Sequence, residues 1–430
     1  MKTMIAPPAA DRAVDVPRQP VADPMRALLG NGLMFLLPAL VLTTPDSLTV
    51  VQAVMLVAVL AAGRARWAAI WRLHGRAVRW IAFGFVGYFL VSLLRLAVFE
   101  HPLRTLDGPF RLLLSLSCIA FVCLYRPRQR WFWLGMCVGA IGAGVVALAE
   151  WQLAGVDRVE GFTHHAITFG DLAVALGVMA LCSLSEWRGG RWGWLPVAAL
   201  VSGLAASVLS GSRGGWVGLL LVVPPLLHYG SAVHGRRIVH AVLAVLALCV
   251  VAYFVPATSI ERRTMDAVHE VQRWFAVNDA TTHVGVRLEL WKASWMMISE
   301  HPWLGVGRDN FFTALNALHA EGRLQASPAL VYSSSHNDLI HTLATGGLLD
   351  FSLLLVMYLA PLLFFLRVLA QPGSEGRTAA LAGMSLVVCY FGFGQTEVMF
   401  WLMMPKIFYG MMVCVLAGLC LTAGPSPLKR

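Results

Sequence analysis

Residues 126–153 read RPRQRWFWLGMCVGAIGAGVVALAEWQL, in which three arginines come before a long apolar run. The run from Trp131 to Leu153 contains one charged residue, Glu150, close to its far end. About 20 apolar residues suffice for an α-helix to cross the hydrocarbon core of a bilayer. The stretch therefore predicts a membrane-spanning helix with positive charge at its beginning.

Apolar runs of this kind recur along almost the whole chain. Only 13% of the 430 residues are charged, about half the ~25% typical of soluble domains, and the mean hydropathy is +0.69. The alternating segments of ~10 residues that mark a membrane β-barrel are not found. We therefore expect an all-α, polytopic membrane protein with about 12 transmembrane helices. The predicted spans are 27–44, 48–63, 80–98, 109–125, 131–153, 166–186, 194–211, 214–229, 238–256, 347–367, 378–397 and 402–422.

Arginine and lysine in the short connections indicate the orientation, because they concentrate on the cytoplasmic side. One side holds Arg64, Arg66, Arg72, Arg76, Arg79, Arg126, Arg128, Arg130, Arg188, Arg191, Arg236, Arg237, Arg367 and Arg377. The short connections of the other side hold Arg104, Arg158, Arg213 and Lys406. We assign the first side, together with both termini, to the cytoplasm.

This topology divides the chain into five segments. Residues 1–24 form a flexible cytoplasmic N-terminus without a cleavable signal peptide, and 423–430 form a short cytoplasmic C-terminus. Transmembrane helices 1–9 occupy 25–256, and helices 10–12 occupy 347–422. Between spans 9 and 10, residues 257–346 form one long, partly helical loop on the outer face, and long loops are often functional.

Composition and motifs exclude several classes of function. The net charge of +10 comes mostly from arginines that set topology, so no nucleic-acid binding is expected. All eight cysteines fall inside apolar spans, so no disulfide framework is expected. A P-loop, a Gly-x-Ser-x-Gly elbow, a Cys-x-x-Cys and a His-Glu-x-x-His motif are all missing from the sequence. We expect no metal site and no cofactor.

Within the long loop, an apolar stripe has the spacing of an amphipathic helix. The stripe consists of Val284, Leu288, Trp291, Trp295 and Ile298. Tryptophans on such a stripe are typical of a helix that lies at the membrane surface. Packing of the stripe on the mouths of the spans is an equally good interpretation.

Two arginines on the outer face are candidate phosphate ligands, because a guanidinium group binds phosphate oxygens in pairs. Arg213 lies in Ser-Gly-Ser-Arg-Gly-Gly (210–215), a tight connection whose glycines let a ligand approach the backbone. Arg287 begins the predicted amphipathic helix. The alternatives are snorkelling to lipid headgroups for Arg213 and a salt bridge for Arg287.

The segment SHNDLIH (335–341) holds the candidate base. Ser335 at the N-cap with Asp338 three residues later predicts a helix start, which places His336 at a helix N-terminus. The helix dipole disfavours an imidazolium ion there, so a neutral ring is able to accept a proton. The spacing of His336 and His341 does not suit two metal ligands on one helix face. A structural role for His336 is the alternative.

Four acidic residues lie within or at the outer ends of predicted spans. They are Glu150, Asp171, Asp350 and Glu397. Ionisable residues in such places are functional candidates. Their roles stay open, because such residues also form hydrogen bonds to neighbouring helices.

Together these residues resemble the O-antigen ligase family, part of the O-antigen ligase/polymerase superfamily, and the resemblance covers the topology of nearly the whole chain. Ser-Arg-Gly-Gly (212–215) is similar to one family motif, and the segment from Arg287 to Phe311 is similar to the loop signature. His336-Asn337, nine further residues and Gly347 resemble a third motif. Asp350 departs from that motif, which ends on Gly, Thr or Tyr.

The resemblance implies a metal-independent glycosyltransferase of the bacterial inner membrane with its site facing the periplasm. Its donor would be a polysaccharide on undecaprenyl diphosphate, and its acceptor would be lipid A–core. His336 would act as the general base, and Arg213 and Arg287 would stabilise the diphosphate leaving group in an inverting displacement. Further candidates for substrate binding are Arg158, His165, Arg308 and Asp338.

Alternative functions stay open at this point. An O-antigen polymerase or a protein O-oligosaccharyltransferase would use the same carrier. The Arg-x10-Gly pattern of polymerases is missing, since Pro224 and Ile298 occupy the glycine positions after Arg213 and Arg287. A flippase or transporter of lipid-linked glycans would place polar residues at the bilayer midplane, often within repeats. The polar candidates gather instead at the outer ends of the spans.

Overall fold

The computed structural model describes residues 24–100, 102–212, 214–254, 260–373 and 375–423, and its regular elements are all helices. The first half contains α1 (Pro24–Leu40), α2 (Ser47–Ala61), α3 (Arg64–Val98), α4 (Asp107–Leu114), α5 (Ser117–Tyr125), α6 (Gln129–Leu153), α7 (Ala166–Leu181), α8 (Leu195–Ser210) and α9 (Gly214–His234). The second half contains α10 (Arg236–Phe254), α11 (Ile260–Val277), α12 (His283–Glu300), α13 (Phe311–Ala320), α14 (Asp338–Leu369), α15 (Arg377–Phe393) and α16 (Met403–Thr422).

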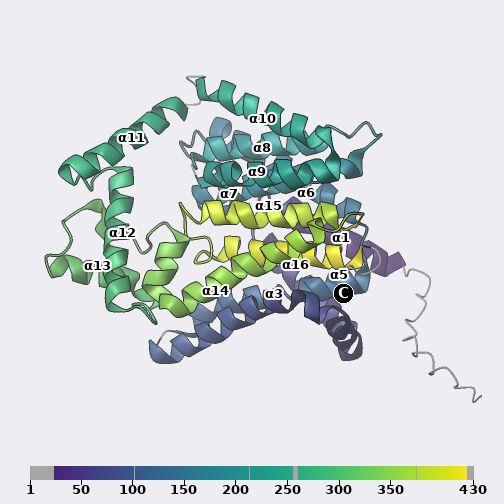
Figure 1. Ribbon diagram of the computed structural model, residues 1–430, viewed down its shortest axis with the longest axis horizontal. Helices are drawn as coiled ribbons and strands as arrows, with labels where there is room; N and C mark the ends of the chain where they lie inside the picture. The colour runs from purple at the N-terminus through teal and green to yellow at the C-terminus, as the bar shows by residue number, and fades with distance from the viewer. Residues whose placement is uncertain (1–23, 101, 213, 255–259, 374, 424–430) are drawn as a thin grey trace, which may run out of the picture.

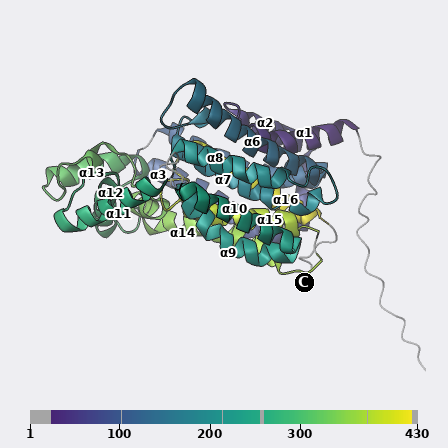
Figure 2. The ribbon, with the colours of Figure 1, turned by 90° about the horizontal axis from the view of Figure 1, so that it is seen from above.

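The protein is a polytopic helical membrane protein. Among the described residues, six helical segments are long and apolar enough to cross a membrane: α3, α4 with α5, α6, α9, α14 and α16. Five shorter apolar helices accompany them: α1, α2, α7, α8 and α15. Figures 1 and 2 show these helices in one bundle, with α11, α12 and α13 beyond one end of it. We call the described residues 260–337 the loop region.

The centre of the bundle consists of α7 and α16, whose residues are almost all buried. Glycines let neighbouring helices of the bundle approach one another closely. A Cβ atom on Gly139 of α6 would lie 2.0 Å from the carbonyl oxygen of Pro38 on α1. A Cβ atom on Gly203 of α8 would lie 2.3 Å from the carbonyl oxygen of Ala173 on α7. Any larger residue at either position would force the two helices apart.

The predicted spans differ from the helices of the structure at several boundaries. Residues 64–79, expected in a connection, belong to α3, because alanine, leucine and arginine are strong helix formers. The span expected at 109–125 is divided into α4 and α5. The span expected at 378–397 ends at Phe393, because the chain turns after Gly394 and the amide of Thr396 bonds back to the Phe393 carbonyl. Glu397 consequently lies in a connection rather than in a span.

Helix α14 is interrupted at Gly347, which has a φ of 63°. The segment from His301 to Gly307 crosses α14 at this break. There the amide of Val306 donates a 3.0 Å hydrogen bond to the Ala344 carbonyl. The break frees carbonyl groups that an intact helix would use, and the crossing segment satisfies them. A Cβ atom on Gly347 would lie 2.3 Å from Trp303, so this glycine is needed for the contact.

The predicted amphipathic helix at 284–298 is confirmed as α12, but its buried face is the opposite one. The buried apolar residues are Val286, Leu290, Ala293 and Met297, which pack with α13 in a second hydrophobic cluster. In the predicted stripe, Trp295 is 68% exposed, and Ile298 packs against this cluster while it is only partly buried. The spacing of apolar residues alone could not show which face is buried, because α12 carries apolar residues on two sides.

Candidate functional site

A cavity of about 630 Å³ lies where the loop region meets the bundle. Four of the predicted site residues line it: Arg158, His165, Arg287 and His336. Arg213 lies outside the described residues, but its neighbours Ser212 and Gly214 both line the cavity. The tertiary structure thus brings together residues from four separate connections and helix starts. We call this cavity the His336 cavity.

The start of α14 differs from the predicted one. Asn337 caps the helix, and its Oδ1 accepts hydrogen bonds from the amides of Leu339 (3.0 Å) and Ile340 (3.1 Å). The expected cap of Ser335 with Asp338 is therefore wrong. Ser335 is buried and donates instead to the Asn337 carbonyl at 3.2 Å, so its hydroxyl does not reach the helix amides.

His336 directly precedes this cap in a backbone conformation that is uncommon for residues other than glycine. Its φ is 50°, in the left-handed region. The ring of Tyr332 packs edge-on against the imidazole, with 5.2 Å between the centroids. The side chain is 18% exposed and lines the cavity. Uncommon backbone conformations of this kind cluster at functional sites.

The carboxylate of Glu397 holds the His336 ring from behind. Both carboxylate oxygens lie 3.2 Å from His336 Nδ1, and the amide of Val398 donates to Oε1 at 2.9 Å. Burial raises the pKa of the Glu397 carboxyl, but the hydrogen bond and charge of His336 outweigh burial, so that pKa lies below its usual value. A charged carboxylate can only accept, so in the neutral form of the ring the proton lies on Nδ1 and Nε2 is an acceptor.

Ser212 fixes the α8–α9 connection that carries Arg213. The Ser212 hydroxyl donates a 2.8 Å hydrogen bond to Asp171 Oδ1 on α7. A Cβ atom on Gly214 would lie 2.3 Å from the hydroxyl of Thr396, one residue before Glu397. The two residues that flank Arg213 are therefore held beside the segment that carries the partner of His336.

Arg287 is positioned by the start of α12. Thr282 caps this helix, and its hydroxyl accepts from the amide of Gly285 at 3.0 Å. One turn after Arg287, the indole Nε1 of Trp291 donates a 2.9 Å hydrogen bond to the Ser335 carbonyl. This bond fixes the face of α12 that carries Arg287 beside the residue that precedes His336.

Arg158 and His165 complete the polar wall of the cavity. Arg158 Nε donates to the Ser210 carbonyl at 3.1 Å, which ties the α6–α7 connection to the end of α8. His165 caps α7 by accepting from the Thr168 amide through Nδ1, and its Nε2 lies 3.9 Å from the Glu397 carboxylate. The structure therefore brings two histidines close to one buried carboxylate.

Arg308 and Asp338, the two other candidates, lie outside the cavity. Asp338 is buried and accepts from the Phe400 amide at 3.2 Å and from the Tyr358 hydroxyl at 3.3 Å. Arg308 donates to the Tyr88 hydroxyl at 2.7 Å and to the Trp401 carbonyl at 3.0 Å. Both side chains join the 394–402 connection to neighbouring helices.

Arg308 belongs to a second polar cluster, in which Arg95 of α3 forms an ion pair with Asp350 of α14 and also donates to the Thr345 carbonyl. The space among these side chains is about 20 Å³, enough for about one water molecule. We call Arg95, Asp350, Arg308 and His341 the α3–α14 cluster. Asp350, which departs from the family motif, thus has a local structural partner.

The sequence did not indicate two of these contacts. Glu397 and Asp350 stood out as acids in apolar surroundings, but nothing in the sequence connected them to His336 or to Arg95. Glu150 likewise proves to accept hydrogen bonds from the amides of Glu160 and Gly161, which shapes the α6–α7 connection. Among the described residues, no group of three or more His, Cys, Asp or Glu side chains is placed to hold a metal ion.

Comparison with known proteins agrees with the motifs around this cavity. Residues 198–355 match the family model described as O-antigen ligase. This part of the chain is similar to the O-antigen ligase family. The matched segment runs from α8 through the loop region into α14, and so includes Arg213, Arg287 and His336. A relative from Haemophilus influenzae, described only as an uncharacterised protein, is 23% identical over 317 residues, which cover 72% of this chain and 78% of the relative.

Proposed function

We propose that this protein is an O-antigen ligase, which transfers a polysaccharide from undecaprenyl diphosphate to lipid A–core. The observation that carries the proposal is the His336 cavity. In it, the Nε2 acceptor of His336 shares one space with Arg287 and with the flanks of Arg213. A base and a set of cations are the two devices that a displacement at a sugar phosphate requires without a bound metal.

His336 takes the proton of the acceptor. As the acceptor hydroxyl attacks the anomeric carbon of the donor sugar, its proton passes to Nε2 of His336. Glu397 keeps the other proton on Nδ1 and stabilises the imidazolium ion that forms. The same carboxylate orients the ring, so the base is ready before the substrates meet.

The arginines take up the charge of the leaving group. The bond between the anomeric carbon and the phosphate oxygen breaks, and undecaprenyl diphosphate leaves with its electron pair. Arg287 and Arg213 stabilise the negative charge that develops on the diphosphate. One displacement inverts the anomeric centre. The phosphate ester supplies the driving force, so no cofactor takes part.

The position of the cavity suits two lipid-linked substrates. It lies between the end of the bundle and the loop region, so each headgroup would enter it while the lipid chain stays in the membrane. With the arginine-rich connections in the cytoplasm, this end faces the periplasm. The proposal therefore includes twelve spans and an inner-membrane location.

The test is transfer in vitro by purified protein, with lipid-linked glycan as donor, lipid A–core as acceptor and EDTA present. We expect a modified acceptor in the wild type and loss of product in Arg213→Ala, Arg287→Ala and His336→Ala. Elongation of the donor glycan without use of the acceptor would show a polymerase instead. Modification of an added protein acceptor alone would show a protein oligosaccharyltransferase. Movement of the carrier across liposomes without any transfer would overturn the enzyme assignment.

A further inference from the structure

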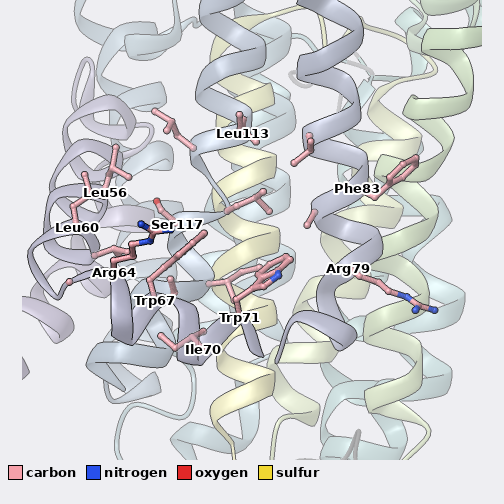
Figure 3. A pocket seen from close by; sticks show the side chains of 18 residues that line it. Leu56, Leu60, Arg64, Trp67, Ile70, Trp71, Arg79, Phe83, Leu113 and Ser117 are labelled. Carbon is pink, nitrogen blue, oxygen red and sulfur yellow. The ribbon is translucent and has the colours of Figure 1, made fainter. Parts of the chain in front are cut away.

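A second, larger cavity lies away from the His336 cavity, among α2, α3 and the α4–α5 segment. Its volume is about 900 Å³. Apolar side chains form nearly all of its wall, and Figure 3 shows Leu56 and Leu60 on one side with Phe83 on another. Trp67 and Phe83 are about half exposed, so the cavity opens to the side of the bundle. Nothing in the proposed transfer reaction uses this space.

The mouth of this cavity carries positive charge. Arg64 and Arg79 line it, and Figure 3 shows Trp67 and Trp71 between the two arginines. Arg79 also lies over the ring of Trp80, with 5.4 Å from Cζ to the centroid. Helices α2, α3 and α5 contain no aspartate and no glutamate, so no acidic residue of these helices neutralises the arginines.

The first part of α3 has the composition of a helix in the headgroup layer. From Arg64 to Trp80 it carries five arginines and three tryptophans, and most of these side chains are exposed. Tryptophan rings concentrate at the level of the headgroups, and clusters of basic residues attract anionic lipids there. The apolar wall behind them continues to Val86 and Leu113, deeper in the bundle.

We propose that this cavity binds one anionic glycerophospholipid from the leaflet at this end of the bundle. The acyl chains occupy the apolar space among α2, α3 and α5, and the anionic headgroup lies at the mouth that carries Arg64 and Arg79. Charge complementarity selects an anionic headgroup, because the wall offers two guanidinium groups and no carboxylate from these helices. The arginines of α3 thus bind a specific lipid in addition to setting the topology.

The test is native mass spectrometry of the purified full-length protein with phosphatidylglycerol or phosphatidylcholine of the same acyl chains. We expect the wild type to retain phosphatidylglycerol at least about 10-fold better. Arg64→Gln/Arg79→Gln should lower that retention about 10-fold. Arg66→Gln/Arg72→Gln is the matched control, because it removes the same charge from the same helix at residues that do not line the cavity.

A second variant tests the apolar part. Ser117→Phe places a ring in the cavity without changing any charge, and we expect it to reduce the retention of both lipids. If both double arginine variants lost phosphatidylglycerol to the same extent, the proposal would be overturned, because binding would then be a diffuse attraction to the charged surface. Equal retention of the two lipids by the wild type would also overturn it. A third outcome would also overturn it: a wild-type dimer that carries no lipid and that Ser117→Phe converts to a monomer. A second copy of the chain would then cover the cavity.

Discussion

His336 and His341 are five residues apart at the start of α14, but their surroundings differ. His336 faces a cavity of about 630 Å³, and its Nδ1 is held by a carboxylate. His341 is buried between the rings of Phe311 and Trp401, beside a space of about 20 Å³. Both histidines have arginines and an acid nearby. Only His336 can meet a substrate of the size of a sugar phosphate.

The same contrast separates the arginines of the two regions. Arg95 and Arg308 donate to an acid, a tyrosine and backbone carbonyls, so their donors stabilise the contact of α3 with α14 and the 394–402 connection. Arg158 donates to the Ser210 carbonyl, but both Arg158 and Arg287 also line the His336 cavity, which has room for a substrate. A charged residue in an apolar chain is therefore structural where its partners enclose it, and available for chemistry where a cavity adjoins it. Substitutions in the two regions should affect different measurements.

The largest effect is expected for His336→Ala. Loss of a general base lowers the rate of a displacement by roughly 10²–10⁴-fold. The transfer assay measures this loss on the folded protein. The thermal unfolding temperature should also fall, because the substitution leaves the buried Glu397 carboxylate without its histidine partner. His301→Ala, an exposed histidine of the loop region, is the control. Transfer by His336→Ala within a factor of three of the wild type would remove His336 from the mechanism.

Arg287→Ala should reduce the transfer rate by roughly 10²–10³-fold, the size found when one group that stabilises a developing negative charge is removed. Arg287→Lys should recover part of the rate, because it keeps the charge but not the paired donors. Arg308→Lys is the contrasting variant. It should lower the unfolding temperature, and the transfer rate of the folded enzyme should stay within about threefold of the wild-type rate. The reverse pattern would mean that the two arginines had been assigned to the wrong regions.

Asp350→Ala should destabilise the protein by about 3–5 kcal/mol, because it leaves the guanidinium group of Arg95 buried without its carboxylate partner. Arg95 is only 5% exposed, so water cannot replace the partner. Unfolding in detergent measures the effect. The double variant Arg95→Met/Asp350→Ala should recover most of the stability. If the single variant were as stable as the wild type, the α3–α14 cluster would not stabilise the fold.

Glu397→Gln should lower the transfer rate by roughly 10–100-fold, the range seen when a partner that orients a functional imidazole is removed. The amide still bonds to the ring but cannot stabilise the imidazolium ion. Glu397→Asp should also transfer more slowly than the wild type, because the shorter side chain lies farther from Nδ1 of His336. A loss in affinity for the donor without a change in rate would instead give Glu397 a binding role.

The smallest effect concerns stability in acid. The pKa of Glu397 is lower in the folded protein than its usual value of 4.5, so its stabilising contribution is present above that value and is lost as the pH falls through the folded pKa. The unfolding temperature of the wild type should therefore fall as the pH falls below 4.5. Glu397→Gln should lack this part of the acid loss. Identical acid profiles would show that the His336–Glu397 contact does not stabilise the fold.

Much of the fold could be predicted because membrane helices are recognised by length and apolarity. Each predicted span overlaps a helix or a pair of helices of the structure, and α12 was expected from its spacing. The errors have one origin. Residues 64–79 are helical although they contain five arginines, and α15 ends at Phe393, before the predicted end of its span. Hydropathy reports where lipid or protein surrounds the chain, whereas hydrogen bonding decides where a helix begins and ends.

The sequence by itself determined the class of the protein, the apolar segments and the residue types available for chemistry, because these depend on local composition and spacing. Only the tertiary structure decided which polar residues meet. Glu397 reaches His336 across 61 positions, and Asp350 reaches Arg95 across 255. Such contacts depend on how whole helices pack, and packing is set by glycines and side-chain shapes on both partners at once. For that reason Arg308 and Asp338, which looked like candidates for substrate binding, lie in structural contacts, while Glu397 lies behind the proposed base.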